Sequence, residues 1–171
     1  MKWKRRVLWT LLTLVLGLAA AAGAATDQAT QTVTITVEEI AQLSASGDPA
    51  TLTLTNAGTT AGSLPTPATD ASTSLSWSAN VASGSRKLTA ALDATFTSGI
   101  VLKAALAKPG GSSGSSSGQV TLSDTAKDIF TGITNENCTG ATISFEASLS
   151  KMIAPVTNES KTLTWTLTAA Q

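Results

Sequence analysis

The side chains that most often carry acid–base or nucleophilic chemistry are missing from this chain. It contains no histidine and a single cysteine, Cys138, so neither a Ser-His-Asp nor a Cys-His arrangement can form. Zinc sites built from histidine or from several cysteines are excluded for the same reason. We therefore predict a protein that is not an enzyme and that holds no cofactor or metal ion.

Cys138 has no partner for a disulfide within the chain. A lone thiol is either a small buried hydrophobic residue or a handle between molecules. Burial is the favoured interpretation, because free cysteine is among the most buried residue types.

Two pairs of polar residues have the spacing of a catalytic site. Ser148 and Lys151 match the pattern S-x-x-K, but Ser148 falls on the outer face of a predicted strand, whereas that chemistry needs the serine at a helix start. Asp124 and Asp128 would converge if their segment were helical, and paired carboxylates can hydrolyse glycosides or bind Ca²⁺. A cap or turn role for Asp124 is favoured over both, so a hydrolase is only the third hypothesis.

Two tryptophans beyond the first 25 residues, Trp77 and Trp165, could form a platform for sugar rings if they were exposed. Both alternate in phase with leucine, Leu75 for one and Leu167 for the other, so packing in the core is the favoured interpretation. The two tryptophans are kept as candidate contact residues.

A second candidate contact surface is the loop between Lys151 and Ser160, which carries Met152, Ile153 and Val156. Apolar residues near the tip of a hairpin are either covered by their own domain or contact a partner. Cover by the same domain is slightly favoured, and contact with a partner is the alternative.

The elements that would position these residues are strands, because apolar residues recur at every second position through most of the chain. In the last segment, Leu163, Trp165 and Leu167 alternate with threonines, which turns the apolar side chains to one face and the threonines to the other. The same alternation occurs over residues 31–37, 51–55, 72–79, 86–92, 100–106, 120–122 and 142–150.

About seven to nine short strands separated by turn residues predict an all-β fold, an antiparallel β-sandwich of the Ig-like or jelly-roll-like kind. A closed barrel is the alternative. Because residues 72–79 and 86–92 are separated by a turn sequence, we expect them to pair as a hairpin.

Three other segments have less regular patterns. Residues 31–37 are expected to continue past a kink at Glu38 and Glu39 as an edge strand that changes sheets. Residues 124–133 should form one helical turn or an irregular crossing that buries apolar residues. The Gly/Ser-rich residues 109–118 have the composition of a flexible loop.

The chain begins like a secretory signal peptide. Residues 1–6 are basic, an apolar run follows from Val7 to Leu18, and small residues lead to Ala25. The apolar run is shorter than the roughly 20 residues that a membrane span needs. We therefore expect a cleaved leader over residues 1–25 and a single domain over residues 26–171, with an uncleaved anchor as the alternative.

Removing the leader changes the charge balance, because Lys2, Lys4, Arg5 and Arg6 all lie in it. The rest of the chain carries seven basic and eleven acidic residues, a net charge near −4. This argues against a nucleic-acid binder, which would show a basic patch. The sequence has no second long apolar run, so no stable membrane span is expected after cleavage.

The ending Thr162-Leu-Thr-Trp-Thr-Leu-Thr168 resembles the distal motif of WxL-domain proteins, which are non-covalent cell-wall-binding surface proteins of Gram-positive bacteria. Trp165 and Leu167 carry the match, whereas Trp77-Ser-Ala79 stands where that family has its earlier Trp-x-Leu. A leader followed by one Thr/Ser-rich sandwich also resembles fimbrial and spore-coat-U-type subunits in general plan, without their paired cysteines. These resemblances imply a bacterial surface protein that contacts cell-wall glycan or other surface subunits.

We therefore predict a secreted protein of the cell envelope, extracellular or periplasmic, that acts by contact. The first hypothesis is a structural or adhesive subunit whose sheet edges or apolar loop meet other surface subunits. The second is a cell-wall or glycan-binding module. The candidate contact residues are Trp165, Trp77, Met152, Ile153 and Val156.

Overall fold

The computed structural model describes residues 27–170, and most of the segments in which apolar and polar residues alternate form strands. These residues form nine strands and no helix, so this part has no helix that could cross a membrane. The expected leader, residues 1–25, lies outside the described residues and stays a prediction.

The chain divides into two units, residues 1–36 and residues 37–171. In the described part of the first unit, residues 27–36 form no strand, and Val33 and Ile35 are 78% and 81% exposed. The expected edge strand over residues 31–37 is therefore not formed, because no neighbouring strand supplies its hydrogen bonds among the described residues. The strands described all belong to the second unit.

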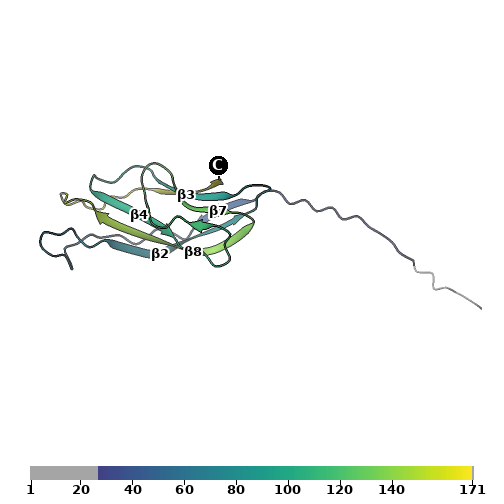
Figure 1. Ribbon diagram of the computed structural model, residues 1–171, viewed down its shortest axis with the longest axis horizontal. Helices are drawn as coiled ribbons and strands as arrows, with labels where there is room; N and C mark the ends of the chain where they lie inside the picture. Colours follow the sequence, from purple (N-terminus) through teal and green to yellow (C-terminus); the bar gives the residue numbers. More distant parts are fainter. Residues whose placement is uncertain (1–26, 171) are drawn as a thin grey trace, which may run out of the picture. The chain divides into compact units, whose positions relative to one another are not determined.

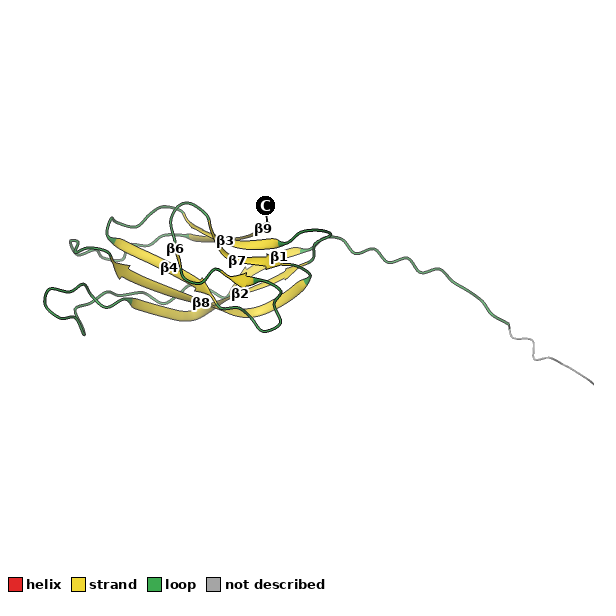
Figure 2. Cartoon of the chain, viewed as in Figure 1, coloured by secondary structure: helices red, strands yellow, loops and turns green. Residues whose placement is uncertain are grey.

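The second unit is an antiparallel β-sandwich, which confirms the predicted fold class (Figure 1, Figure 2). One sheet has the order β1-β2-β8-β4-β6, formed by β1 (Ala41–Ala45), β2 (Ala68–Ala79), β8 (Glu136–Leu149), β4 (Ile100–Leu106) and β6 (Val120–Thr121). The other has the order β5-β7-β3-β9, formed by β5 (Ser115–Ser116), β7 (Lys127–Ile133), β3 (Arg86–Leu92) and β9 (Leu163–Ala169).

The core lies between the two sheets and is built from the inward-facing alternate residues of both. Trp77 of β2 and Phe130 of β7 meet across it, with ring centroids 5.5 Å apart. The largest fully buried side chains are Phe130, Leu75, Leu88, Leu106, Ile129, Ile133 and Ile143.

The expected hairpin between residues 72–79 and 86–92 is wrong, because β2 and β3 belong to different sheets. Both sides of β2 are occupied, by β1 and by β8, so β2 has no free edge for β3. The turn sequence between them therefore carries the chain from one sheet to the other.

The segment 124–133 also differs from its expected form. From Lys127 it is strand β7, paired with β3 and β5, and not a helical turn. Asp124 and Asp128 therefore do not share a helix face, and Asp128 forms an ion pair of 3.0 Å with Lys87 instead. The expected short strand over residues 51–55 is absent as well, although Leu52 packs against the core.

A β-bulge in β8 decides which of its residues face the core. Between the pairs Ala141–Leu75 and Cys138–Trp77, β8 takes three steps where β2 takes two. The extra residue lies beside Gly140, whose φ of +69° suits the left-handed conformation of such a bulge. The bulge shifts the inward-facing set, so both Ala141 and Cys138 are buried.

Candidate contact surfaces

Trp77 is a core residue and cannot contact a ligand as it stands. Only 2% of its surface is exposed, and its indole N–H donates a 2.9 Å hydrogen bond to the Glu136 carboxylate. Trp77 is therefore removed from the candidate contact residues, because its ring faces are covered by the inside of the sandwich.

Trp165 lies in a different setting, on the edge strand β9. Together with Leu163 and Leu167 it packs against the core but remains partly exposed. In a fully enclosed sandwich these three apolar side chains would be buried. The side of the molecule along β9 therefore shows apolar side chains to the outside.

The loop between β8 and β9 carries the other candidates. Met152 is 69% exposed and Val156 is 44% exposed. Ile153 is half-buried, and its side chain lies so close to Gly99 that a Cβ there would come within 2.5 Å of it. Ile153 is thus partly covered, whereas Met152 and Val156 are exposed.

Among residues 27–170, the backbone of β9 pairs with a strand on one side only, that of β3. Asp93 N donates to Thr162 O, and Ala170 N donates to Ser85 O, both at 2.9 Å. Hydrogen-bonded pairs alternate in an antiparallel ladder, so the threonines of β9 turn their N–H and C=O groups toward β3. The N–H and C=O groups of Leu163, Trp165, Leu167 and Ala169 point away from the sheet.

The β9 edge lacks three features that often protect an edge strand: a charged side chain, a proline and a bulge. Its seven residues contain no charged residue and no proline, and its register with β3 is regular along the whole strand. The edge strand of the other sheet, β1, has five residues and contacts β9 across the sandwich. Both sheets therefore end on the same side of the molecule.

Glu136, at the start of β8, holds together segments that are far apart in the sequence. One carboxylate oxygen accepts from Trp77 Nε1 and Ser112 Oγ, each at 2.9 Å. The other accepts from Ser113 N at 2.7 Å and Ser113 Oγ at 2.6 Å. Burial raises the pKa of the Glu136 carboxyl, but the hydrogen bonds from Ser113, Trp77 and Ser112 together lower it more, so its pKa lies below the ordinary 4.5.

The Glu136 contacts fix the Gly/Ser-rich loop, which was expected to be flexible. Gly114 is buried in this loop, and a Cβ on it would come within 2.2 Å of the Phe130 ring. Short strand β5, just after it, pairs with β7. The loop therefore packs against the sandwich and helps to cover Phe130.

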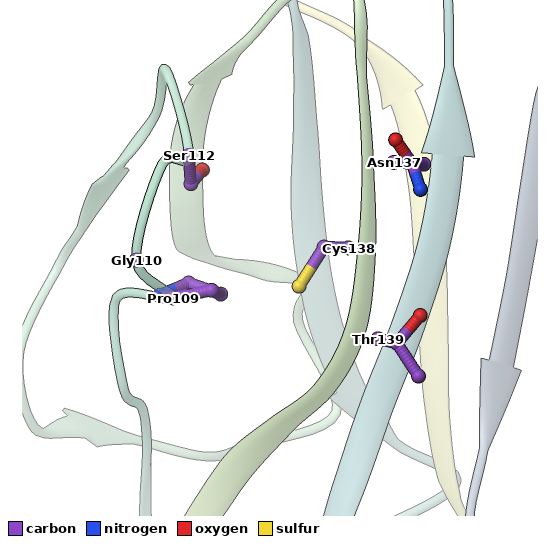
Figure 3. A pocket seen from close by; sticks show the side chains of 6 residues that line it. All are labelled: Pro109, Gly110, Ser112, Asn137, Cys138 and Thr139. Atoms are coloured by element: carbon purple, nitrogen blue, oxygen red, sulfur yellow. The ribbon is translucent and has the colours of Figure 1, made fainter.

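Cys138 lies at the bottom of a small pocket between this loop and β8 (Figure 3). The pocket has a volume of about 210 Å³ and is lined by Pro109, Gly110, Ser112, Asn137, Cys138 and Thr139. Burial, and then the nearby Glu136 carboxylate, raise the pKa of the Cys138 thiol. A protonated buried thiol is a poor nucleophile, so this pocket offers no reactive group.

A wider, open hollow covers the outer face of the first sheet over β1, β2 and β8. Its volume is about 600 Å³, and the polar side chains that line it are uncharged: Gln42, Ser44, Ser76, Ser78, Asn137 and Thr139. Hydroxyl and amide groups of this kind can hydrogen-bond sugar hydroxyls. The only aromatic residue in the lining is the buried Trp77, so no ring is offered for stacking.

Within residues 27–170, no three acidic, histidine or cysteine side chains gather into a group that could hold a metal ion. The S-x-x-K pair has no helix, because Ser148 is part of β8. Comparison of the chain with protein-family models, with curated proteins and with solved structures gives no match.

Proposed function

We propose that this protein is a secreted structural subunit of the cell surface that works by contact between its own copies. The observation that carries the proposal is the open β9 edge. It combines seven residues of regular strand, outward-pointing backbone groups and partly exposed apolar side chains.

An edge of this kind is costly for a protein that stays monomeric. Unpaired N–H and C=O groups on a flat strand are a template for pairing with another chain, and monomeric proteins usually block them with charge, proline or a bulge. The protein instead places Trp165 and Leu167 there, partly exposed. Such a strand suits a protein whose edge is covered in its assembled form.

The test compares two lysine substitutions on half-buried leucines. Leu167→Lys places a charge on the inner side of the open edge, where an added strand would have to bury it. Leu102→Lys is the matched control, because Leu102 also packs half-buried against the core but its carbonyl already accepts from Leu122 N at 2.9 Å.

The full chain is expressed with its own first 25 residues, and the purified product is followed by light scattering and electron microscopy. We expect the unchanged protein and Leu102→Lys to assemble and Leu167→Lys to remain monomeric. Ala169→Pro, which removes one outward N–H at an exposed position, is a second edge variant in case Leu167→Lys does not fold. A strict monomer at high concentration of unchanged protein would overturn the proposal.

A glycan-binding module is the second candidate, and the uncharged hollow over β1, β2 and β8 favours it. Retention on isolated cell walls tests it, with Gln42→Ala and Asn137→Ala in the hollow compared with Trp165→Ala on the β9 edge. Loss of retention only in the hollow variants would support glycan binding. Unchanged retention in all three would exclude both surfaces as the glycan site.

A further inference from the structure

The segment before the sandwich has the sequence of a strand but no partner for one among the described residues. Val33, Ile35 and Val37 alternate with threonines, and they are 78%, 81% and 74% exposed. Residues 31–37, called the arm below, lie in no strand. Three neighbouring β-branched apolar residues this exposed indicate a surface that is covered by something else.

The residues that directly follow the arm are held to the sandwich by hydrogen bonds and an ion pair. The Asn80 side chain donates to Glu38 O at 2.9 Å and accepts from Ile40 N, while Asn80 N donates to Ile40 O at 3.1 Å. Glu39 pairs with Arg86 at 3.3 Å. Residues 38–40 are therefore held by the sandwich and lead into β1. The occupant we argue for is a second copy, because each copy has one segment of strand sequence that pairs with no strand and one edge strand with a free side among the described residues.

The arm resembles the β9 edge in pattern. In each, apolar residues alternate with threonine: Val33, Ile35 and Val37 in the arm, and Leu163, Trp165 and Leu167 in β9. A strand added beside β9 would bond the outward N–H and C=O groups of Trp165 and its alternate neighbours. With its apolar residues turned inward, the arm would extend the core layer and cover Trp165 and Leu167.

We propose that residues 31–37 of one copy add as a strand to the free edge of β9 in a second copy. The inference rests on the proposed function and names the contact through which the copies assemble. Each copy offers one arm and one edge, so the contact is head-to-tail and propagates into a chain of subunits or closes into a ring.

The first test places lysine on either face of the arm, in the full chain expressed with its own first 25 residues. Ile35→Lys puts a charge on the face that would turn inward, and Thr34→Lys puts the same charge on the opposite face. Both positions lie outside the strands, so neither change should disturb the sandwich. We expect Ile35→Lys to raise the concentration needed for assembly by at least about tenfold, and Thr34→Lys to leave it within about twofold.

The second test mixes two variants that fail for different reasons. Ile35→Lys keeps the β9 edge and loses the arm, whereas Leu167→Lys, or Ala169→Pro in its place, keeps the arm and loses the edge. We expect neither to assemble alone and the mixture to give one-to-one dimers, because only one productive contact is left.

The outcomes separate the two proposals. Assembly of Ile35→Lys at the unchanged concentration, with Leu167→Lys monomeric, would overturn the role of the arm and leave the proposed function standing. Failure of the mixture to form dimers would also overturn the role of the arm. A strict monomer of the unchanged protein would overturn both.

Discussion

Replacing Glu136 by glutamine should destabilise the sandwich, although the change is nearly isosteric. The carboxylate accepts from Trp77 and Ser112 on one oxygen and from the Ser113 N–H and hydroxyl on the other. A glutamine can keep its amide oxygen toward only one of these two sets. Its NH₂ group then faces the other set, which contains at least one N–H that cannot rotate to become an acceptor.

The size of the effect follows from that unpaired donor. Leaving a partly buried N–H without an acceptor costs about 1–3 kcal/mol, and hydrogen bonds to a charged group contribute about 1.5–3 kcal/mol. We therefore expect Glu136→Gln to lower the free energy of unfolding by about 2 kcal/mol. For a domain of this size the midpoint of thermal unfolding should fall by roughly 5–10 °C.

The effect should also depend on pH. The folded protein lowers the pKa of Glu136 below its ordinary 4.5, so the carboxylate stabilises the fold above that pH. This contribution is lost as the pH falls from about 4.5 through the lower pKa of the folded state. The difference in the free energy of unfolding between the unchanged protein and Glu136→Gln should therefore be largest at pH 7 and become smaller below pH 4.5.

Urea unfolding, followed by tryptophan fluorescence at pH 7 and at several values below 4.5, measures both quantities. Ser113→Ala, alone and combined with Glu136→Gln, should show non-additivity, since the hydroxyl that it removes is one of the donors to the Glu136 carboxylate. The reasoning would be refuted if Glu136→Gln lowered the free energy of unfolding by less than about 0.5 kcal/mol at pH 7. It would also be refuted if the difference in this free energy between the two proteins did not change with pH.

Three further results are expected from the same structure. Gly114→Ala should lower stability in urea by about 1–3 kcal/mol, because the added Cβ would lie 2.2 Å from the Phe130 ring, whereas Gly110→Ala, which meets nothing within 4 Å, should be nearly neutral. The thiol of Cys138 should react slowly with a disulfide reagent in the folded protein and quickly in urea, since burial raises its pKa, and a fast reaction of the folded state would contradict its placement. Met152, 69% exposed, should be oxidised rapidly by peroxide without a change in the unfolding midpoint, and slow oxidation of the monomer would show that it is covered.

The strand faces could be predicted from the sequence because a period of two is a local property. Thus Leu75, Ile143 and Phe145 face the core as their alternation indicates. Which strands pair is not local, and the expected hairpin between β2 and β3 was wrong because β8 and β1 take both sides of β2. The sequence contains the bulge residue Gly140, but nothing local shows that it shifts the face of Cys138.

Glu136 was not predicted as a structural centre, because its partners are distant in the sequence. Ser113 lies 23 residues away and Trp77 lies 59 residues away. Residues 134–140 have the composition of a polar turn, and residues 109–118 that of a flexible loop, so neither segment indicates a contact with the other. The only local signal is a lone acid two positions before a cysteine that becomes buried.

The arm shows the same limit. Its alternation predicts a strand, but residues 31–37 pair with no strand among the described residues. Sequence periodicity indicates that a segment is fit for a sheet, but it does not indicate whether that sheet belongs to the same molecule or to another copy.

The contact between copies can be measured directly by photo-crosslinking from position 35 of the arm. A benzophenone amino acid replaces Ile35 in the full chain, and assemblies are grown from a mixture of isotopically heavy and light copies before irradiation. Mass spectrometry of the linked peptides should join position 35 to residues 163–169, with heavy–light pairs among them. Links confined to single copies, or links from position 35 to β1 or β6 in place of β9, would contradict strand addition between copies.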